Sequence, residues 1–538
     1  MQSSLRNALG LLVGVVALSA CADVLPTAPA APLDPNADFA ATAVSLQATP
    51  AGFIRIGVVP SATSIPLGAS GEWTLRNKAT GAVLFSGNGG TVTVDLLAAG
   101  EVRTRRWFQV TCTGNPATVT DYVTRGDAAG FETRTEDLGF CVRVLFSTLP
   151  VGSSSAAQSA FQAELGAAGL PSAGFWRTIT VVSGESQLQV SHGADETVVT
   201  DPVVIESADD VVTIGGQPYR GLGEVWTNSG GTLAGINELP LETYLYGVVP
   251  RELPPVPYGA AEAQKAQAVA ARTYALANMG KRAADGYDLL PTTGDQVYGG
   301  LAAEHPISTA AVDATTGVVA VHNGSLVSTL YHSTSGGFTA NSEDVFANAV
   351  PYLRGVPDQQ RGQALEHASL EAFKRYANPT SLRNRAEGDF ESDWSIYHRW
   401  VATWSHEEMA EALSRGFNTT VTRVDAIRVV ERADHGRVLR IEFDTDAGTL
   451  VGLKDAIRSR LPYPLASGAF SSLRSTMFFI EPHRVNGQVV GWIAYGGGWG
   501  HGVGMSQTGA VGMAEAGATY AEILAYYYQG SGLETRGP

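Results

Sequence analysis

Short runs of β-prone residues, separated by turn residues, dominate the chain from residue 51 to 140. Arg55–Val59 and Thr91–Asp95 are two such runs, and Gly, Asn and Ser residues lie between them. Runs of this kind, bounded by turn residues, are typical of β-strands. The pattern therefore predicts a β-rich domain over residues 51–140.

The pattern changes in the next segment, residues 141–182. Val142–Phe146 is a predicted strand, and apolar residues at helical spacing follow between 157 and 168, with Ser155 as a cap. A Gly-Leu-Pro sequence ends this helix before a second strand, Arg177–Val182. The segment resembles half of a SPOR-type glycan-binding repeat, and an ordinary βαβ piece of the scaffold is the alternative.

Strands alternate with one long predicted helix, Tyr258–Met279, in the body from residue 203 to 538. One face of this helix carries small residues, which indicates close packing. Residues 358–418 are polar and helical in pattern, and Ser405 with Glu408 forms a capping box. Because 538 residues exceed one ordinary core, we expect a multidomain α+β protein, with a helical insertion at about 358–418 in its body.

Residues 1–21 have the pattern of an export signal. The apolar run Ala8–Leu18 follows a single basic residue, Arg6, and is too short to span a bilayer. It ends in Leu-Ser-Ala-Cys, which resembles the lipobox of bacterial lipoproteins and makes Cys21 the expected lipidated residue. A plain secretory peptide is the alternative. Residues 22–50, rich in Ala and Pro, are the expected linker to the folded body.

The formal net charge of −16 makes nucleic acid a poor partner, because phosphate backbones attract proteins through Lys and Arg. Besides Cys21, the chain contains Cys112 and Cys141. In an oxidising compartment these two could form a disulfide, and two buried free thiols are the alternative. No CxxC or HExxH pattern occurs, so neither a metal nor another cofactor is expected.

Glu252 is the candidate catalytic residue. Its neighbours are mostly apolar, and Pro250 and Pro254 stiffen the chain ahead of the long helix. A partly desolvated carboxylate has a raised pKa and can stay protonated near neutral pH, as a general acid on a glycosidic oxygen must. On the residues alone, the alternative is that Glu252 pairs with Arg251 or with solvent.

Three ordered segments carry longer motifs: Asn237–Pro254 with Lys265–Tyr274, then Tyr331–Gly337 with Asn341–Val345 and Pro351–Leu353, and finally Gly498–Gln507. Together they resemble the SpoIID/LytB family of stage II sporulation protein D and the amidase enhancer LytB. The resemblance covers roughly residues 219–530. It implies that Glu252 occupies the position of the family's proposed catalytic glutamate.

Other motif residues are candidates for substrate binding. Gln267 and Tyr274 share a helix face that could contact sugar, with core packing as the alternative, and two histidines lie in Gly- or Ser-rich loops that allow close approach of a polymer. The full set is Gln267, Tyr274, His332, Ser333, Ser335, Glu343, His501 and Gln507.

Zinc is not expected here. Some family members carry a Cys pair, ahead of a motif like Gln296-Val297-Tyr298, that helps to hold zinc. This chain has Leu289 and Asp295 in the corresponding places.

The resemblance implies a lytic transglycosylase that cleaves peptidoglycan glycan strands. It would be exported and lipid-anchored to the cell membrane or outer membrane, facing the cell wall. One rival is a non-catalytic glycan-binding enhancer of an N-acetylmuramoyl-L-alanine amidase, which would make such an amidase its partner. A second rival is a hydrolase with two carboxylates, in which Glu343 or Asp344 supplies the second.

Overall fold

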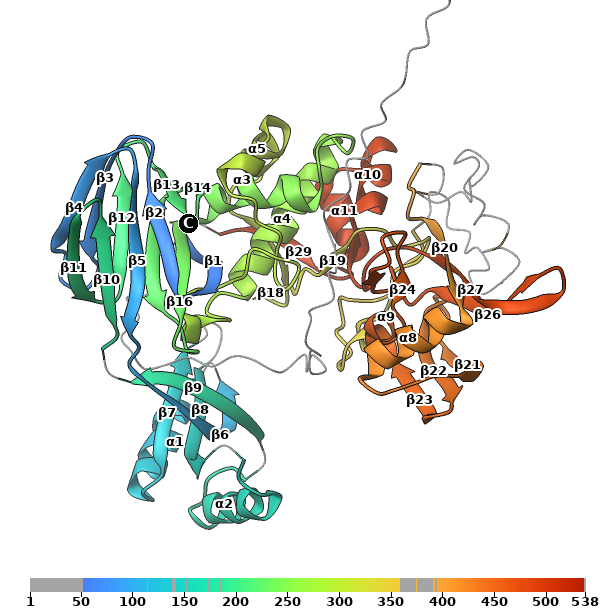
Figure 1. Cartoon of the computed structure of the whole chain (residues 1–538), viewed down its shortest axis with the longest axis horizontal. Coiled ribbons are helices and arrows are strands. Elements are labelled where there is room, and N and C mark those ends of the chain that lie inside the picture. Colours follow the sequence, from blue (N-terminus) through green and yellow to red (C-terminus); the bar gives the residue numbers. More distant parts are fainter. Residues whose placement is uncertain are drawn as a thin grey trace, which may run out of the picture.

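The computed structural model describes residues 52–536, except 114, 138–141, 151, 173, 184, 359–373, 375–389 and 392–393. It confirms a multidomain α+β protein with a β-rich N-terminal region. Figure 1 shows a β-sandwich, a helical body and a C-terminal module in a row, and a small α/β unit beside the sandwich. In the part of the chain that the structure describes, no helix is both long and apolar enough to cross a membrane.

Two six-stranded antiparallel sheets form the sandwich. Alternate side chains point inward, so that Trp73, Leu75, Val92 and Val94 are buried between the sheets. In order, the first sheet contains β1 (Phe53–Ala62), β16 (Leu233–Pro240), β15 (Leu222–Thr227), β12 (Val203–Ser207), β3 (Glu72–Asn77) and β4 (Val83–Asn88). The second contains β11 (Asp195–Thr200), β10 (Gln187–His192), β5 (Thr91–Ala98), β2 (Ser64–Gly68), β13 (Val211–Ile214) and β14 (Gln217–Arg220).

A complete βαββαβ unit is inserted between β5 and β10. It contains β6 (Glu101–Thr113), α1 (Pro116–Ala128), β7 (Glu132–Asp137), β8 (Val142–Pro150), α2 (Ser155–Ala167) and β9 (Phe175–Ser183). The strands form an antiparallel sheet in the order β7-β8-β6-β9. Both helices pack on one face of it, where Phe161 and Leu165 of α2 meet Phe108 and Phe146.

This arrangement corrects the expected boundaries. The β-rich region does not run unbroken from 51 to 140, because β6 pairs with β8 and β9 rather than with the sandwich strands. The expected 141–182 segment is therefore half of a unit that spans 101–183. The body also starts later than residue 203, since β12, β15 and β16 belong to the sandwich.

The body follows β16 directly. Its helices are α3 (Leu241–Glu252), α4 (Ala261–Ala277), α5 (Pro306–Asp313), α6 (Ser342–Val345), α10 (Gln507–Glu515) and α11 (Tyr520–Tyr527). Its strands are β17 (Val318–His322), β18 (Ser325–Leu326), β19 (Tyr331–His332), β28 (Met505–Ser506) and β29 (Gly532–Thr535).

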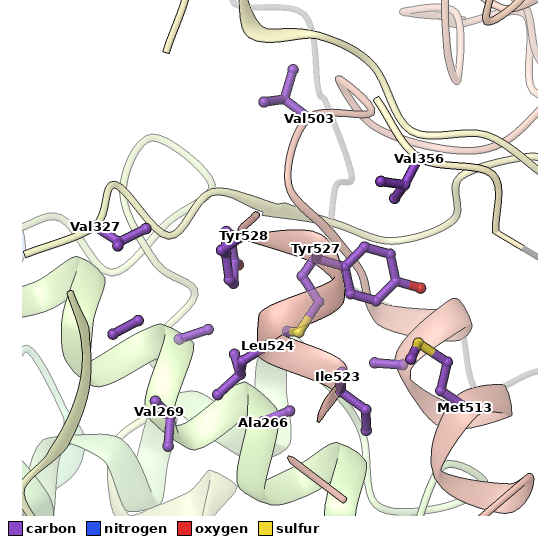
Figure 2. Packing of buried hydrophobic residues seen from close by; sticks show 14 of the residues in the cluster. Ala266, Val269, Val327, Val356, Val503, Met513, Ile523, Leu524, Tyr527 and Tyr528 are labelled. Carbon is purple, nitrogen blue, oxygen red and sulfur yellow. The ribbon is translucent and has the colours of Figure 1, made fainter. Parts of the chain in front are cut away.

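Helix α4 is the centre of the body's core. Figure 2 shows Ala266 and Val269 of α4 beside Ile523 and Leu524 of α11, with Met513 of α10 nearby. The small side chains of α4 let these helices approach closely, as the small-residue face predicted. Because α10 and α11 come from the C-terminal end of the chain, the core joins the first and third motif segments.

The C-terminal module contains two three-stranded sheets, β20-β27-β26 and β21-β22-β23. Its elements are β20 (Arg399–Ser405), α8 (His406–Phe417), β21 (Val424–Arg432), β22 (Val438–Thr445), β23 (Gly448–Leu453), α9 (Ile457–Arg460), β24 (Tyr463–Pro464), β25 (Phe470–Ser471), β26 (Phe478–Val485) and β27 (Gln488–Gly497).

The expected helical insertion at about 358–418 falls partly outside the described residues. Its described C-terminal part is a strand, β20, followed by the helix α8, so this part is not helical throughout. The strand forms because alternate residues, including Trp400 and Trp404, are buried. The predicted capping box is confirmed, with Ser405 and Glu408 each bonding the other's backbone N–H.

Candidate functional site

Glu252 is the last residue of α3, and it is only 7% exposed. The helix is fixed because Tyr244, Leu245 and Val248 pack in a buried cluster that also contains residues of the sandwich strands β1 and β16. Gly247 lets the following loop approach α3, since a Cβ there would lie 2.6 Å from the ring of Tyr298. The sequence thus places a carboxylate at a helix end facing the loop 296–300.

Burial raises the pKa of Glu252 to about 7. The backbone N–H of Val297 donates to its Oε1 over 2.6 Å, and hydrogen bonds with Gln507 and Tyr331, together with the charge of Arg251, oppose the rise in pKa. Glu252 therefore exchanges a proton near neutral pH, which is the property that a residue serving as both acid and base needs.

The hydrogen bonds around Glu252 bring all three motif segments together. The amide of Gln296 donates to the Tyr331 hydroxyl over 3.0 Å and accepts from the Tyr244 hydroxyl over 3.3 Å. Gln507 donates to Gln267 over 3.3 Å. Two of the predicted residues, Gln267 and Gln507, thus lie in the surroundings of Glu252.

The parallel pairing of β19 with β28 accounts for this convergence. Tyr331 lies opposite Met505 and His332 lies opposite Ser506, so Gln507 follows at the start of α10. Sequence reasoning did not select Tyr331 as a site residue. Its place at the start of the second motif was the available signal.

Tyr274 contacts a buried ion cluster rather than Glu252 directly. Its hydroxyl donates to Asp295 over 3.4 Å, and the carboxylate of Asp295 pairs with Lys281 at 2.6 Å and with Arg282 at 3.0 Å. We infer that Tyr274 positions the loop that carries Val297.

The places where some family members hold zinc do not fit a metal here. Leu289 is a buried apolar side chain, and both oxygens of Asp295 are engaged by cations and by the N–H of Leu290. Zinc sites in proteins require several N, S or O ligands around one ion. Among the described residues, no group of three or more His, Cys, Asp or Glu side chains could hold one.

His332, which is buried, and His501, which is half-buried, lie side by side with ring centroids 5.6 Å apart. Nδ1 of His332 is 3.2 Å from the carbonyl of Val503, whose N–H donates to Nδ1 of His501 over 3.0 Å. Burial lowers the pKa of both histidines, that of His501 to about 4. Both are therefore neutral at neutral pH, and their contact with substrate stays a prediction.

Ser333 and Ser335 are buried in a polar network behind the motif loops. Ser335 donates to Asp358 over 2.7 Å and to Glu391 over 3.3 Å, and Glu391 lies 3.1 Å from Nδ1 of His398. The carbonyl of Ser333 accepts hydrogen bonds from α10. These contacts fix the loops, and a role of the two serines in binding substrate stays a prediction.

Glu343 is held by an arginine. Arg354 binds both of its carboxylate oxygens, and this pairing lowers the pKa of Glu343 to about 2. Its neighbour Asp344 lies 2.9 Å from His435. Glu343 is therefore ionised near neutral pH and cannot donate a proton there.

The remaining predicted positions are largely outside the described residues. Cys21 and Cys141 are among these, so neither the lipid anchor nor the disulfide is tested. Cys112 lies on β6, opposite Arg143 of β8.

Two family models match the chain. The one described as stage II sporulation protein matches residues 229–322, which include Glu252, and a domain of unknown function (DUF8618) matches residues 340–504. The chain is also 30% identical over 354 residues to an uncharacterized protein of Brachyspira hyodysenteriae, covering 66% of this chain and 81% of that protein.

Two named proteins of Bacillus subtilis are also similar. The amidase enhancer is 30% identical over 304 residues, which cover 54% of this chain and 40% of the enhancer. Stage II sporulation protein D is 28% identical over 311 residues, which cover 55% of this chain and 75% of that protein. With the three motif segments gathered around Glu252, these matches show that the chain belongs to the SpoIID/LytB family.

Proposed function

We propose that this protein acts in cell-wall remodelling by cleaving peptidoglycan glycan strands, as a lytic transglycosylase whose single acid and base is Glu252. Its family and its relatives named amidase enhancer and stage II sporulation protein D support the cell-wall role. The observation that carries the chemistry is a buried carboxylate with a pKa of about 7 at the meeting point of the three motifs.

In the proposed reaction, protonated Glu252 donates its proton to the glycosidic oxygen as the bond from that oxygen to C1 breaks. The resulting carboxylate then takes the proton of the C6 hydroxyl on the same sugar, and O6 bonds to C1. No water is consumed, and the new end is a 1,6-anhydro sugar. Val297, Tyr331 and Gln507 hold the carboxylate in place for both proton transfers.

The surroundings of Glu252 favour one carboxylate over two. None of the groups that chiefly set its pKa is another carboxylate. Glu343 is already bound by Arg354 on both oxygens. A hydrolase would need a second carboxylate to activate water or to attack the sugar.

The second candidate is a non-catalytic enhancer of a cell-wall amidase, which the name of one relative favours. Incubating purified glycan strands with the mature protein alone separates the two functions. A transglycosylase shortens the strands without a partner. An enhancer leaves them intact and only accelerates an added amidase.

We also propose that the protein works outside the cytoplasm, held to a membrane by a lipid on Cys21. The apolar run and the Leu-Ser-Ala-Cys sequence support this placement. Replacing Cys21 with Ser should move the protein from the membrane fraction to the soluble fraction of fractionated cells. If the variant stays with the membranes as the parent does, the anchor is not on Cys21.

The segment 141–182, which resembles half of a SPOR-type repeat, is the second half of the βαββαβ unit at residues 101–183. We propose that it provides a second contact with glycan. A chain that lacks residues 101–183 should then bind isolated glycan strands more weakly than the intact chain does. Equal binding would exclude this contact.

A further inference from the structure

Five half-buried aromatic residues gather on the surface where the body meets the C-terminal module. They come from separate parts of the chain: the loop after Glu252, the segment before β20, the strand β24 and the third motif. With one arginine they form what we call the aromatic cluster: Tyr258, Trp394, Tyr397, Tyr463, Trp499 and Arg474.

The rings are in contact through Arg474. Its guanidinium carbon lies 5.5 Å from the ring centroids of Tyr397 and Tyr463, and 5.9 Å from that of Trp499. The ring centroids of Tyr397 and Trp499 are 4.1 Å apart. The rings of Tyr258 and Trp394 have centroids 5.4 Å apart. Burial, and to a smaller extent the nearby Tyr397, raises the pKa of Tyr258 to about 12, so the two pairs of rings are neighbours.

The chain connects this cluster to Glu252 on two sides. Tyr258 follows Glu252 in the same loop, which Gln264 holds by donating to the carbonyls of Leu253 and Tyr258. Trp499 precedes Gln507 in the third motif, and Gln507 bonds to Glu252. Two segments that contribute to the surroundings of Glu252 therefore also contribute to the cluster.

Trp394 of the cluster uses its indole N–H, which donates to the carbonyl of Phe390 over 3.1 Å, but other polar groups of the cluster have no partner among the described residues. Within the described residues, the guanidinium of Arg474 makes no ion pair or hydrogen bond, and neither the indole N–H of Trp499 nor the hydroxyl of Tyr397 has a partner. Exposed apolar side chains lie next to the cluster in sequence, with Val256 65% and Ile396 56% exposed. Exposed apolar area with unpaired donors indicates a binding surface rather than packing alone.

We propose that the aromatic cluster is a saccharide-binding subsite, which holds the glycan strand beyond the bond that Glu252 cleaves. Sugar rings have an apolar C–H face that packs on aromatic rings and a rim of hydroxyls that accepts hydrogen bonds. Arg474 forms no ion pair with any residue that the structure describes, and we assign it to a carboxylate on the strand, such as a lactyl group freed of its peptide. This inference rests on the proposed function, because it takes peptidoglycan as the strand.

The test measures binding without turnover, in the full chain carrying Glu252→Gln. Two substitutions are added separately, Trp499→Leu and Arg474→Gln, and the matched control is Phe479→Leu. Phe479 is a half-buried ring of the same module that stacks on Arg432 and is not a cluster residue. The ligands are peptide-free glycan strands, which carry lactyl carboxylates, and neutral chitin oligosaccharides. Equal thermal midpoints show which variants are folded.

Trp499→Leu removes one stacking ring and should weaken binding of both ligands by about fivefold to tenfold. Arg474→Gln should weaken binding of the peptide-free strands alone, and Phe479→Leu should weaken neither. Unchanged binding in both cluster variants overturns the subsite. If Arg474→Gln is the only cluster variant that folds, the subsite is overturned when this variant binds peptide-free strands as tightly as the chain with Glu252→Gln alone.

The outcome is separate from that of the proposed reaction. If the parent chain fails to cut strands but binds them through the cluster, the transglycosylase proposal fails and the subsite remains. If the parent chain cuts strands while the cluster variants bind as well as the parent, the subsite fails alone.

Discussion

Replacing Glu252 with Gln should lower the rate of strand cleavage by roughly 10²–10⁴-fold, the factor typical of losing a general acid or base. Gln keeps the size of the side chain and can still accept the N–H of Val297. It cannot give up or take a proton, so both transfers fail while the site keeps its shape. The rate of release of shortened strands from purified glycan is the measurement.

Two further variants make the result specific. Glu411→Gln, on the exposed face of α8 where Glu411 pairs with Arg415, controls for the chemical change itself and should cut at the parental rate. Glu343→Gln tests the hydrolase with two carboxylates. If that mechanism were correct, Glu343→Gln would lower the cleavage rate as much as Glu252→Gln does. We expect a far smaller decrease, because Glu343 already pairs with Arg354.

Cleavage should also fall as the pH rises above about 7. Glu252 acts first as an acid, so the free enzyme is active in its protonated form, and its pKa is raised to about 7 by burial. The protonated fraction falls to about one tenth one unit above this pKa and to about one hundredth two units above it. The value of kcat/KM should decrease in the same proportion, since it reports the free enzyme.

The histidines near the motifs do not cause this loss of activity above pH 7. The pKa values of His332 and His501 are lowered by burial, that of His501 to about 4, so neither changes charge between pH 7 and 9. If the acid were a carboxyl with an unshifted pKa, near 4.5, kcat/KM would instead begin to fall below pH 5. A pH profile that is flat from 6 to 9 would exclude Glu252 as the acid of the free enzyme.

Features that depend on neighbouring residues were predictable from the sequence. The capping box of Ser405 and Glu408 joins positions three residues apart, and it is confirmed. The apolar residues beside Glu252 also predicted its burial and raised pKa, because Val249 and Leu253 are themselves buried in the core clusters on either side of it. The small residues on α4 predicted close helix packing, because they lie on one face of a single helix and can be recognised from their spacing.

Features that depend on distant pairing were not predictable in this way. The sandwich joins β1 to β16 and β5 to β10, across an inserted unit of which the sequence pattern marked only the second half, residues 141–182. Tyr331 reaches Glu252 only through the parallel pairing of β19 with β28. Asp358 and Glu391, which hold Ser335, stand outside every motif segment and gave no signal in the sequence.

The mass of the new strand ends tests the central claim most directly. If Glu252 alone serves as acid and base, O6 replaces the leaving oxygen, and the two products together weigh the same as the strand that was cut. Mass spectrometry of strands digested by the mature protein should therefore find 1,6-anhydro ends without added water. Products that together exceed the mass of the original strand by one water would show hydrolysis and contradict the mechanism.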